Sequence, residues 1–474
     1  MNSPFDELKY KELLKGLEAS EILFSYVKTQ TDILRLDSFY YSKEFLSDEI
    51  IISKTTNKTL KELNASLLSF GAYSLNNFVE YKDSGIPFVR GLNMKNGVLD
   101  FSDTIYIDAN AHKLLWKSEV KPNTILLSMS GTIGEVAIAV QEYQYPMNSN
   151  QDIAKIRLKR ESIRPCYLYA FLRSKYGQNF LKREARGSVQ QHVFLSQIET
   201  IRIPLLPDSF QLQIEQLVKS AHSNLYQSKA LYSDAENMLL SEIGLQDWQP
   251  NNNPVNIKPL KESFLATGRL DAEHYQVKYD ELETIIRSVP YKIIAEIQKF
   301  NARGVQPDYV EEGSVPVVNS KHILEDRLDY ENFERTTREF LSSYERAQIN
   351  YGDILTYTTG ANIGRTQVYL QNNPALASNH VNILRVRDVN PIYLALVLNS
   401  IVGRLQTEKL YTGSAQAELY PCDIEKFIIP LVNPATQESI AAKIQKSFAL
   451  KAESKRLLDE AKRMIEKEIE EGTF

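Results

Sequence analysis

The sequence repeats itself, and this repetition constrains the fold more than any other feature. Gly187-Ser188-Val189-Gln190 returns as Gly413-Ser414-Ala415-Gln416, at a separation of 413 − 187 = 226 residues. Four further matches keep this separation: Tyr167-Leu168 with Tyr393-Leu394, Ile198-Glu199 with Ile424-Glu425, Ile203-Pro204-Leu205 with Ile429-Pro430-Leu431, and Gln211 with Gln437. A series in constant register predicts two similar modules within one chain.

Farther upstream the register drifts by a few residues, as small loop insertions would cause. Gly131-Thr132-Ile133-Gly134 corresponds to Gly360-Ala361-Asn362-Ile363-Gly364, with one extra residue. Arg35-Leu36-Asp37 corresponds to Arg269-Leu270-Asp271, at a separation of 269 − 35 = 234 residues. The duplication therefore covers most of the sequence, beginning near Arg35.

Each module begins with short runs of apolar and β-branched residues on both sides of a glycine turn. Ile125–Ser130 and Val136–Val140 bracket this turn in the first module, and Ile354–Thr359 and Thr366–Leu370 bracket it in the second. Such runs around closely spaced glycines predict paired strands joined by tight turns. We expect a helix next, and then a polar loop that carries the repeated Gly-Ser pair.

A long helical pattern closes each module. Apolar residues recur at helical spacing from Leu217 to Ile243 and again from Ile440 to Ile469, with Pro207 and Pro434 just before the two patterns. Each pattern spans roughly 35 residues, or about 50 Å. Because a lone helix with a narrow apolar stripe is only marginally stable in water, we expect the two helices to pack against each other as an antiparallel coiled coil.

The sequence therefore predicts an α+β fold in which two similar globular regions, related by a pseudo-twofold axis, are separated by two long antiparallel helices. In the N-terminal extension we expect a helix from Phe5 to Leu23. The expected boundaries are a helical extension over 1–34, a first globular region over 35–207, a long helix over 208–246, a linker over 247–268, a second globular region over 269–433 and a second long helix over 434–474.

Composition limits the classes of function. No apolar run approaches the ~20 residues of a membrane-spanning helix. The two cysteines cannot form a disulfide framework, and the six histidines are scattered without metal-ligand spacing. Neither a signal peptide nor a Gly-x-x-x-x-Gly-Lys-Ser/Thr motif is found. We therefore expect a cytoplasmic protein without a membrane partner, a metal site or nucleotide hydrolysis of its own.

At this point the sequence resembles the specificity subunit of type I restriction–modification systems. Globular region and long helix alternate twice over nearly the full length, as in that family, although the extension before Arg35 departs from its pattern. The phrases typical of the family are Leu126-Leu127-Ser128-Met129-Ser130-Gly131-Thr132-Ile133-Gly134, Ile198-Glu199-Thr200-Ile201-Arg202-Ile203-Pro204-Leu205 and Asp423-Ile424-Glu425-Lys426-Phe427-Ile428-Ile429-Pro430.

The resemblance implies that each globular region is a target-recognition domain, which binds one half of a split sequence in double-stranded DNA. It also implies that the helices set the spacing between the two halves and dock methyltransferase subunits. The chain itself would be non-catalytic, with two modification subunits and a restriction subunit as its partners. No cofactor is expected in this chain, because S-adenosylmethionine, ATP and Mg²⁺ would belong to those partners.

A basic stretch over 155–191 is the first candidate DNA contact. It carries ten lysines and arginines against two glutamates, a local net charge of +8, in a chain of formal net charge −5. Lysine and arginine replace the counterions of phosphates, whereas the alternative is a solvated basic face. The equivalent stretch of the second module has four against two, or +2. The candidates are Lys159, Arg160, Lys182 and Arg183.

The loops supply further candidates. Glutamine can bind adenine, and arginine guanine, through paired hydrogen bonds. A structural turn is the alternative for the Gly-Ser loops, and a plain surface loop is the alternative for the residues that follow the strands. The candidates are Arg186, Ser188, Gln190 and Gln191 in the first Gly-Ser loop, Tyr411, Ser414 and Gln416 in the second, and Arg90, Lys95 and Lys321 after the strands.

Two other classes of function stay open. A self-contained DNA methyltransferase or nuclease would need motifs that are missing, because Asn390-Pro391-Ile392-Tyr393 lacks the second proline of a methyltransferase box and Glu453-Ser454-Lys455 lacks an upstream aspartate. A coiled-coil scaffold without a DNA role is the other alternative, and the basic stretch disfavours it.

Overall fold

The computed structural model divides into two compact units. It describes residues 6–30, 34–69, 79–159, 163–187, 191–413 and 416–472. Unit 1 comprises Met1–Tyr226 and Lys451–Phe474, and unit 2 comprises Gln227–Leu450. Each unit therefore holds one globular region together with part of both long helices.

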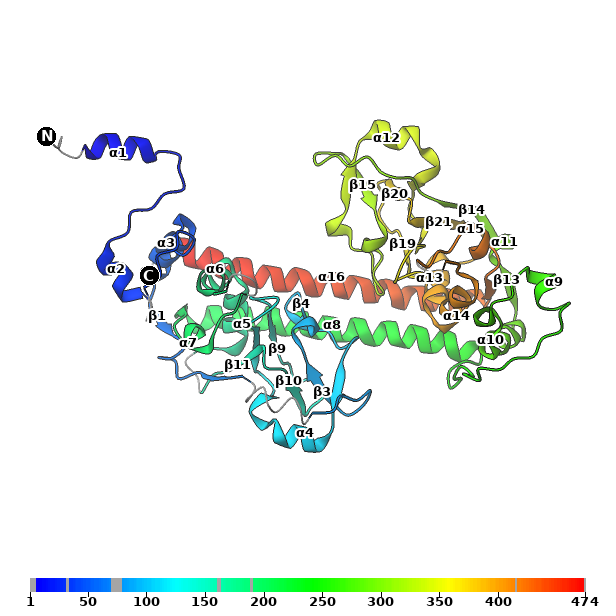
Figure 1. Ribbon diagram of the computed structural model, residues 1–474, viewed down its shortest axis with the longest axis horizontal. Helices are drawn as coiled ribbons and strands as arrows, with labels where there is room; N and C mark the ends of the chain where they lie inside the picture. The colour runs from blue at the N-terminus through cyan, green and yellow to red at the C-terminus, as the bar shows by residue number, and fades with distance from the viewer. Residues whose placement is uncertain are drawn as a thin grey trace. The chain divides into compact units, whose positions relative to one another are not determined.

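The globular region of unit 1 contains two four-stranded sheets among its described residues, β6-β3-β10-β7 and β2-β11-β8-β9. Figure 1 labels β3 and β10 of the first sheet and β9 and β11 of the second. β3 and β10 run parallel, and the other neighbours in these sheets are antiparallel. The strands are β1 (Asn57–Thr59), β2 (Ser66–Leu68), β3 (Ile86–Val89), β4 (Met94–Lys95), β5 (Val98–Leu99), β6 (Ile105–Ile107), β7 (Glu119–Val120), β8 (Ile125–Ser128), β9 (Val136–Ile138), β10 (Met147–Ser149), β11 (Ile153–Arg157) and β12 (Arg202–Pro204).

Unit 2 has the same topology. Its sheets follow the orders β16-β15-β20-β17 and β14-β21-β18-β19, again with one parallel pair, β15 and β20. The strands are β13 (Tyr291–Ile293), β14 (Gln298–Arg303), β15 (Val315–Val318), β16 (Glu334–Thr336), β17 (Gln348–Ile349), β18 (Ile354–Tyr357), β19 (Thr366–Val368), β20 (Ala375–Ala377), β21 (Val381–Val386) and β22 (Ile428–Pro430). The predicted α+β class with two similar modules is confirmed.

Helices pack against these sheets and bury most of the core. The repeated tyrosines fix one of them in each unit, since the Tyr167 hydroxyl donates to the Pro204 carbonyl at 2.8 Å and the Tyr393 hydroxyl donates to the Pro430 carbonyl at 2.7 Å. The shorter helices are α1 (Glu7–Leu14), α2 (Phe24–Gln30), α3 (Lys43–Ser53), α4 (Ala109–Leu114), α5 (Pro165–Arg173), α6 (Lys175–Glu184), α7 (Leu195–Ile198), α9 (Phe264–Thr267), α10 (Val277–Arg287), α11 (Ile294–Ile297), α12 (Arg338–Ser343), α13 (Pro391–Asn399), α14 (Ile401–Leu410) and α15 (Pro421–Ile424), with 3₁₀ turns η2 (Gly91–Asn93), η3 (Trp116–Ser118), η4 (Ala272–Tyr275), η5 (Ser320–His322), η6 (Tyr330–Asn332) and η7 (Glu345–Ala347).

The two expected long helices are present as α8 (Asp208–Glu242, 35 residues) and α16 (Pro434–Glu471, 38 residues). α16 begins with proline at its first position, where no amide donor is needed, and the Asn433 side chain accepts from the Thr436 amide at 2.9 Å. α8 ends before Gly244, whose φ of +74° lets the Leu245 amide donate back to the Leu240 carbonyl at 2.8 Å.

The two long helices run antiparallel where they meet in unit 2. Asp234 follows Ser228 along α8, whereas their partners in α16, Lys443 and Ser447, stand in the opposite order. The Ser228 hydroxyl donates to the Ser447 carbonyl at 2.8 Å, and the Ser447 hydroxyl donates to the Ser228 carbonyl at 2.8 Å. Such small polar residues let the two backbones approach closely, and the reciprocal bonds fix the register of the pair.

The N-terminal extension differs from the expectation. The helix expected from Phe5 to Leu23 is observed only as α1 (Glu7–Leu14), and Phe5 itself lies outside the described residues. Gly16, at a φ of +81°, takes a left-handed conformation that stops the helix, and α2 begins only at Phe24. Among the described residues, no helix has both the length and the hydropathy to cross a bilayer.

Candidate nucleic-acid interface

In unit 1 the glycine turn and the Gly-Ser loop lie together, although they are far apart in the sequence. Ser130 forms a β-bridge with His192, and the Val193 amide donates to the Met129 carbonyl at 2.9 Å. Arg186 and His192 exchange backbone hydrogen bonds at 2.9 and 2.7 Å, which close the base of the loop. We call these segments, Met129–Gly134 and Arg186–Phe194, the unit 1 loop cluster.

Unit 2 has the equivalent arrangement. Thr359 forms a β-bridge with Glu418, and the Gly360 amide donates to the Ala417 carbonyl at 2.9 Å. Thr412 and Glu418 exchange backbone hydrogen bonds at 2.9 and 2.8 Å. The unit 2 loop cluster therefore consists of Thr359–Gly364 and Thr412–Tyr420, and the structure brings the two repeated phrases together in both units.

The glycines form tight turns, as the sequence predicts. Gly134 and Gly364 have φ values of +89° and +88°. A Cβ atom at Gly134 would lie 2.7 Å from Oε1 of Gln178, and one at Gly364 would lie 2.8 Å from Oγ1 of Thr407. Both positions therefore favour glycine, because L residues with a side chain rarely adopt this left-handed backbone conformation.

Each loop cluster ends in an exposed aromatic residue, and sequence reasoning missed both. Phe194 is 54% exposed, and Tyr420 at the equivalent position is 41% exposed. In unit 2 the Arg303 guanidinium lies 4.5 Å from the centroid of the Tyr420 ring and donates to the Leu419 carbonyl at 3.0 Å. Aromatic rings and guanidinium planes are the groups on which nucleobases stack. The signal that could have revealed them is their constant distance from the Gly-Ser pair.

Several predicted contacts lie in or beside these clusters. Gln191 and Gln416 are exposed, and Tyr411 lies at the start of the second loop. The Arg186 side chain is half-buried, and its Nε has no hydrogen-bond partner among the described residues. The predictions for Arg160, Ser188, Gln190 and Ser414 fall outside the described residues.

The candidates that follow the strands are engaged within the protein. Arg90 pairs with Asp103 at 3.3 Å, and Lys321 pairs with Glu334. Lys95 pairs with Asp100 at 2.9 Å. Although partial burial opposes ionisation, hydrogen bonds from Lys95 and Ser102 hold the pKa of Asp100 at about 2. The β4-β5 hairpin that carries Lys95 is fixed against α5, because the Tyr169 hydroxyl donates to the Gly97 carbonyl at 2.9 Å.

Arg183 does not lie on the surface, so its assignment as a DNA contact needs correction. Its residue is only 7% exposed, and its Nη1 lies 2.9 Å from the Glu49 carboxylate. Its guanidinium covers the ring of Tyr40 at 4.2 Å, and its Nε donates to the Tyr40 carbonyl at 2.9 Å. A guanidinium held by these partners cannot reach a phosphate, and we leave it out of the interface.

Other members of the basic stretch are likewise occupied. Arg164 is paired with Asp208 and Glu215, and Lys175 is paired with Glu470. Lys155 is buried, its Nζ donates to the Ser149 hydroxyl at 3.0 Å, and burial lowers its pKa to about 7. Lys159 and Lys182 are exposed. Several cations of this stretch are therefore buried or paired within unit 1, and fewer of them are free to contact DNA than the local charge of +8 indicates.

A cluster of metal-ligating side chains is absent from the part of the chain that the structure describes. No group of three or more His, Cys, Asp or Glu residues among these residues could hold a metal ion. Cys166 is buried and Cys422 is exposed, and both are free thiols.

A family model described as "Type I restriction modification DNA specificity domain" matches residues 52–223 and again residues 293–463. The S subunit of a type I restriction–modification system from M. genitalium is 12% identical, with a TM-score of 0.44, over 87% of this chain and 94% of that chain. The HsdS subunit from Thermoanaerobacter tengcongensis is 15% identical, with a TM-score of 0.29, over 88% of this chain and 97% of that chain. No curated protein matches the chain.

Proposed function

The chain belongs to the type I restriction–modification DNA specificity family, whose model matches more than half of its residues in two separate copies, and from this we propose how its two units divide the work. Its function is DNA-sequence specificity. We propose that unit 1 binds one half of a bipartite duplex target and unit 2 binds the other half.

The observation that carries this proposal is that the two units share one fold but differ in the residues of their loop clusters. Both units have the same sheet orders and the same glycine turn closed by a Gly-Ser loop. The residues at equivalent positions differ, however: Arg186 corresponds to Thr412, His192 to Glu418, and Phe194 to Tyr420. Residues that position the protein can be shared, whereas residues that read two different sequences must differ.

We propose further that the long helices dock two methyltransferase subunits and that a restriction subunit joins the complex. On this proposal the chain has no catalytic activity, S-adenosylmethionine, ATP and Mg²⁺ bind only to its partners, and the complex works in the cytoplasm. Measurable methyl transfer by the purified chain alone would contradict the non-catalytic assignment.

The decisive experiment compares methylated bases in the host genome with the gene intact and with the gene deleted. We expect deletion to remove methylation from one split, asymmetric DNA motif, and an unchanged methylation pattern in an expressing host would refute the proposal. Exchanging residues 47–207 for the equivalent region of a relative should then change one half of the motif and leave the other half intact.

Point variants sharpen this experiment. Phe194→Ala in unit 1 and Tyr420→Ala in unit 2 should each relax base preference in a different half of the motif. Phe39→Ala is the matched control, because Phe39 is exposed to the same degree as Phe194 but lies outside the loop cluster. Relaxation of the same half by both loop variants would argue against one half-target per unit.

A further inference from the structure

Glu184 is a buried carboxylate at a position that disfavours one. It is the last residue of α6 and is 7% exposed, and the free carbonyls at the C-terminal end of a helix repel a negative charge. The Tyr40 hydroxyl donates to its Oε1 at 2.8 Å, and Nε2 of Gln197 donates to its Oε2 at 3.0 Å. The carboxylate therefore joins two side chains that stand 197 − 40 = 157 residues apart in the sequence.

Gln197 carries this connection into the unit 1 loop cluster. It lies in α7, directly after the cluster, and its Oε1 accepts from the backbone amide of Phe194 at 2.8 Å. Its Nε2 donates to the backbone carbonyl of Glu184 at 2.6 Å as well as to the carboxylate. Because a carbonyl and a carboxylate only accept hydrogen bonds, they hold the nitrogen of the Gln197 amide toward α6 and leave its oxygen for Phe194. The position of Phe194 is thus tied to the end of α6.

Tyr40, at the other end of the connection, is firmly held. The guanidinium groups of Arg35 and Arg183 lie 4.4 and 4.2 Å from the centroid of its ring. Nε of Arg183 donates to the Tyr40 carbonyl at 2.9 Å, and Nη1 of Arg35 donates to the Arg183 carbonyl at 2.9 Å. Burial and the charge of Glu184 raise the pKa of Tyr40, so its hydroxyl keeps the proton that it donates. The hydrogen bonds therefore run from a fixed ring to the exposed Phe194.

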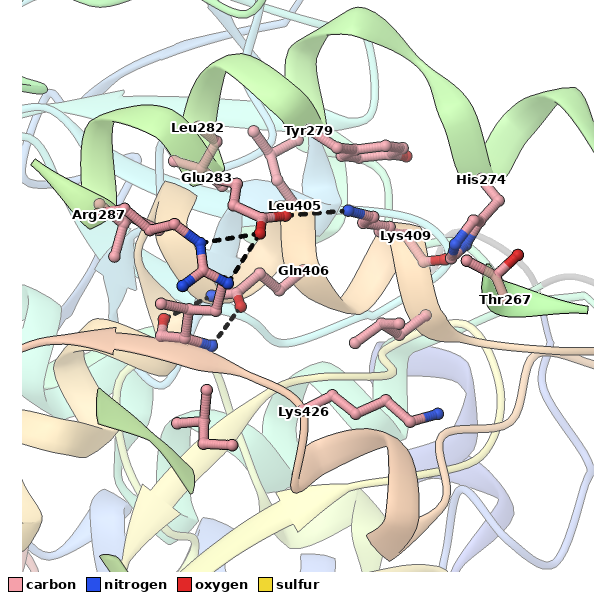
Figure 2. A pocket seen from close by; sticks show the side chains of 14 residues that line it. Thr267, His274, Tyr279, Leu282, Glu283, Arg287, Leu405, Gln406, Lys409 and Lys426 are labelled. Carbon is pink, nitrogen blue, oxygen red and sulfur yellow. Dashed lines mark hydrogen bonds and ion pairs between the residues drawn. The ribbon is translucent and has the colours of Figure 1, made fainter. Parts of the chain in front are cut away.

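Unit 2 lacks this connection. The separations of 226 and 234 residues that relate the repeats place Leu410 at the position of Glu184 and His274 at the position of Tyr40. Figure 2 shows His274 beside Lys409, and its Nδ1 donates to the Lys409 backbone carbonyl at 2.7 Å. A leucine side chain cannot accept a hydrogen bond, so no carboxylate joins these residues to the unit 2 loop cluster at this position.

An aspartate holds the unit 2 loop cluster instead. Asp423 stands at the position of Gln197, and its Oδ2 accepts from the Tyr420 amide at 3.4 Å. Its Oδ1 accepts from Nζ of Lys426, three residues along the chain, at 3.0 Å. The two units therefore support their exposed aromatic residues by different side chains.

We propose that Glu184 is a positioning residue for base recognition, which through Gln197 holds Phe194 in place for the half-target that unit 1 binds. A contact to a base requires the side chain to be held within about 0.5 Å, which hydrogen bonds behind it can provide. The proposal deepens the proposed function and rests on it, because Phe194 contacts bases only if unit 1 binds half of the target.

Duplex binding by the assembled complex tests this role, with the split motif taken from the methylation experiment. Discrimination is the affinity for the intact motif divided by the affinity for a duplex with one base of one half changed. Glu184→Leu, which introduces the unit 2 residue, should lower discrimination in the unit 1 half about tenfold, as loss of one base contact does, and should leave the unit 2 half unchanged. Tyr40→Phe removes one of the two bonds and should lower it about threefold, which keeps the test decisive if Glu184→Leu impairs folding.

Tyr167→Phe is the matched control for Tyr40→Phe. Both variants remove a buried tyrosine hydroxyl from unit 1, but Tyr167 donates to the Pro204 carbonyl at 2.8 Å rather than to Glu184. Tyr167→Phe should keep the discrimination in both halves. Equal relaxation by the two tyrosine variants would overturn the proposal, because it would show a general effect of destabilising unit 1.

A double variant tests whether the effect passes through Phe194. Adding Glu184→Leu to Phe194→Ala should lower discrimination in the unit 1 half no further than Phe194→Ala alone, since both changes remove the same base contact. A further loss in the double variant would contradict the proposed role.

The two levels of the proposal fail in different ways. Failure of the wild-type complex to bind any split motif would refute the proposed function and, with it, the role of Glu184. Discrimination in both halves that neither Glu184→Leu nor Tyr40→Phe changes would refute the role of Glu184 alone.

Discussion

His222 on α8 should control the acid stability of unit 1. The residue is 4% exposed, its ring lies 6.5 Å from that of Tyr143 and 6.3 Å from that of Tyr169, and its Nε2 has no hydrogen-bond partner among the described residues. Burial, assisted by the nearby charge of Arg173, lowers the pKa of His222 to about 4. In the unfolded chain the imidazole regains a pKa of about 6.5.

The sign of the effect follows from these two values. Because the unfolded chain binds this proton more readily than the folded protein, stability is complete above about pH 6.5 and is lost progressively as the pH falls toward 4. Between pH 7 and pH 5 the loss amounts to about 2 kcal/mol of unfolding free energy for this single residue.

Hydrogen exchange of the unit 1 amides provides the assay, since the two units need not unfold together. The wild-type chain should lose about 2 kcal/mol more between pH 7 and pH 5 than His222→Phe, which keeps an aromatic ring but cannot titrate. The reasoning would be refuted by equal losses in the two proteins.

Three further predictions concern charge burial and backbone packing. Arg183→Met should destabilise unit 1 by about 3 kcal/mol in urea unfolding, because it removes the only cation that pairs with Glu49 among the described residues. Lys182→Met, at the exposed neighbouring position, should keep that stability and instead reduce the salt dependence of DNA binding by about one phosphate contact. Burial lowers the pKa of Lys155 to about 7, so folding disfavours its charged form, and the unfolding free energy of unit 1 should rise by about 2 kcal/mol between pH 7 and pH 9. Lys155→Ile should abolish this rise when hydrogen exchange is measured at both pH values. Gly403→Ala should destabilise unit 2 by about 3 kcal/mol, because the new Cβ would lie 2.0 Å from the Leu398 carbonyl oxygen within rigid backbone. The measurement is a lowered midpoint temperature of thermal unfolding.

The sequence predicts the fold well because its strongest signals are periodic. Helical spacing of apolar residues reveals α8 and α16, and the constant register of the repeats predicts two units with equal sheet order. Neither signal depends on contacts between distant residues. The prediction of a long helix in the N-terminal extension is wrong for a local reason. Gly16, with a left-handed φ, ends a helix that composition alone would extend.

The charge of a sequence stretch is a poor guide to the charge of a surface. The basic residues of this stretch pair with acidic residues that are distant in the sequence. Arg183 pairs with Glu49 at a separation of 134 residues, Arg164 with Glu215 at 51 residues, and Lys175 with Glu470 at 295 residues. A window that counts only neighbours cannot detect such partners. The stretch over 155–191 therefore looks strongly basic in sequence, although much of its charge stabilises the contact between helices within unit 1.

Residues that recur in both units have a structural role, whereas residues that contact DNA bases are expected to differ between the units. Gln211 and Gln437 recur, and in both units the side chain accepts from a backbone amide, at 2.9 Å from Arg164 and at 3.2 Å from Asn390. Both glutamines also donate to a carbonyl just before a long helix, and both are buried. The repeated glutamines, like the repeated tyrosines and glycines, thus stabilise the fold that the two units share.

The residues that differ between the units lie next to these repeated residues, and Phe194 and Tyr420 among them are exposed. Phe194 and Tyr420 stand at one equivalent position, and the loops before them change from His192 to Glu418. Because the second residue is acidic, it would repel the phosphate that the first could approach, so the two loops cannot make the same contacts with DNA. Changes of target preference should therefore follow substitutions at these divergent positions, whereas substitutions of Gln211 or Gln437 should reduce folding of a unit without changing which bases it prefers.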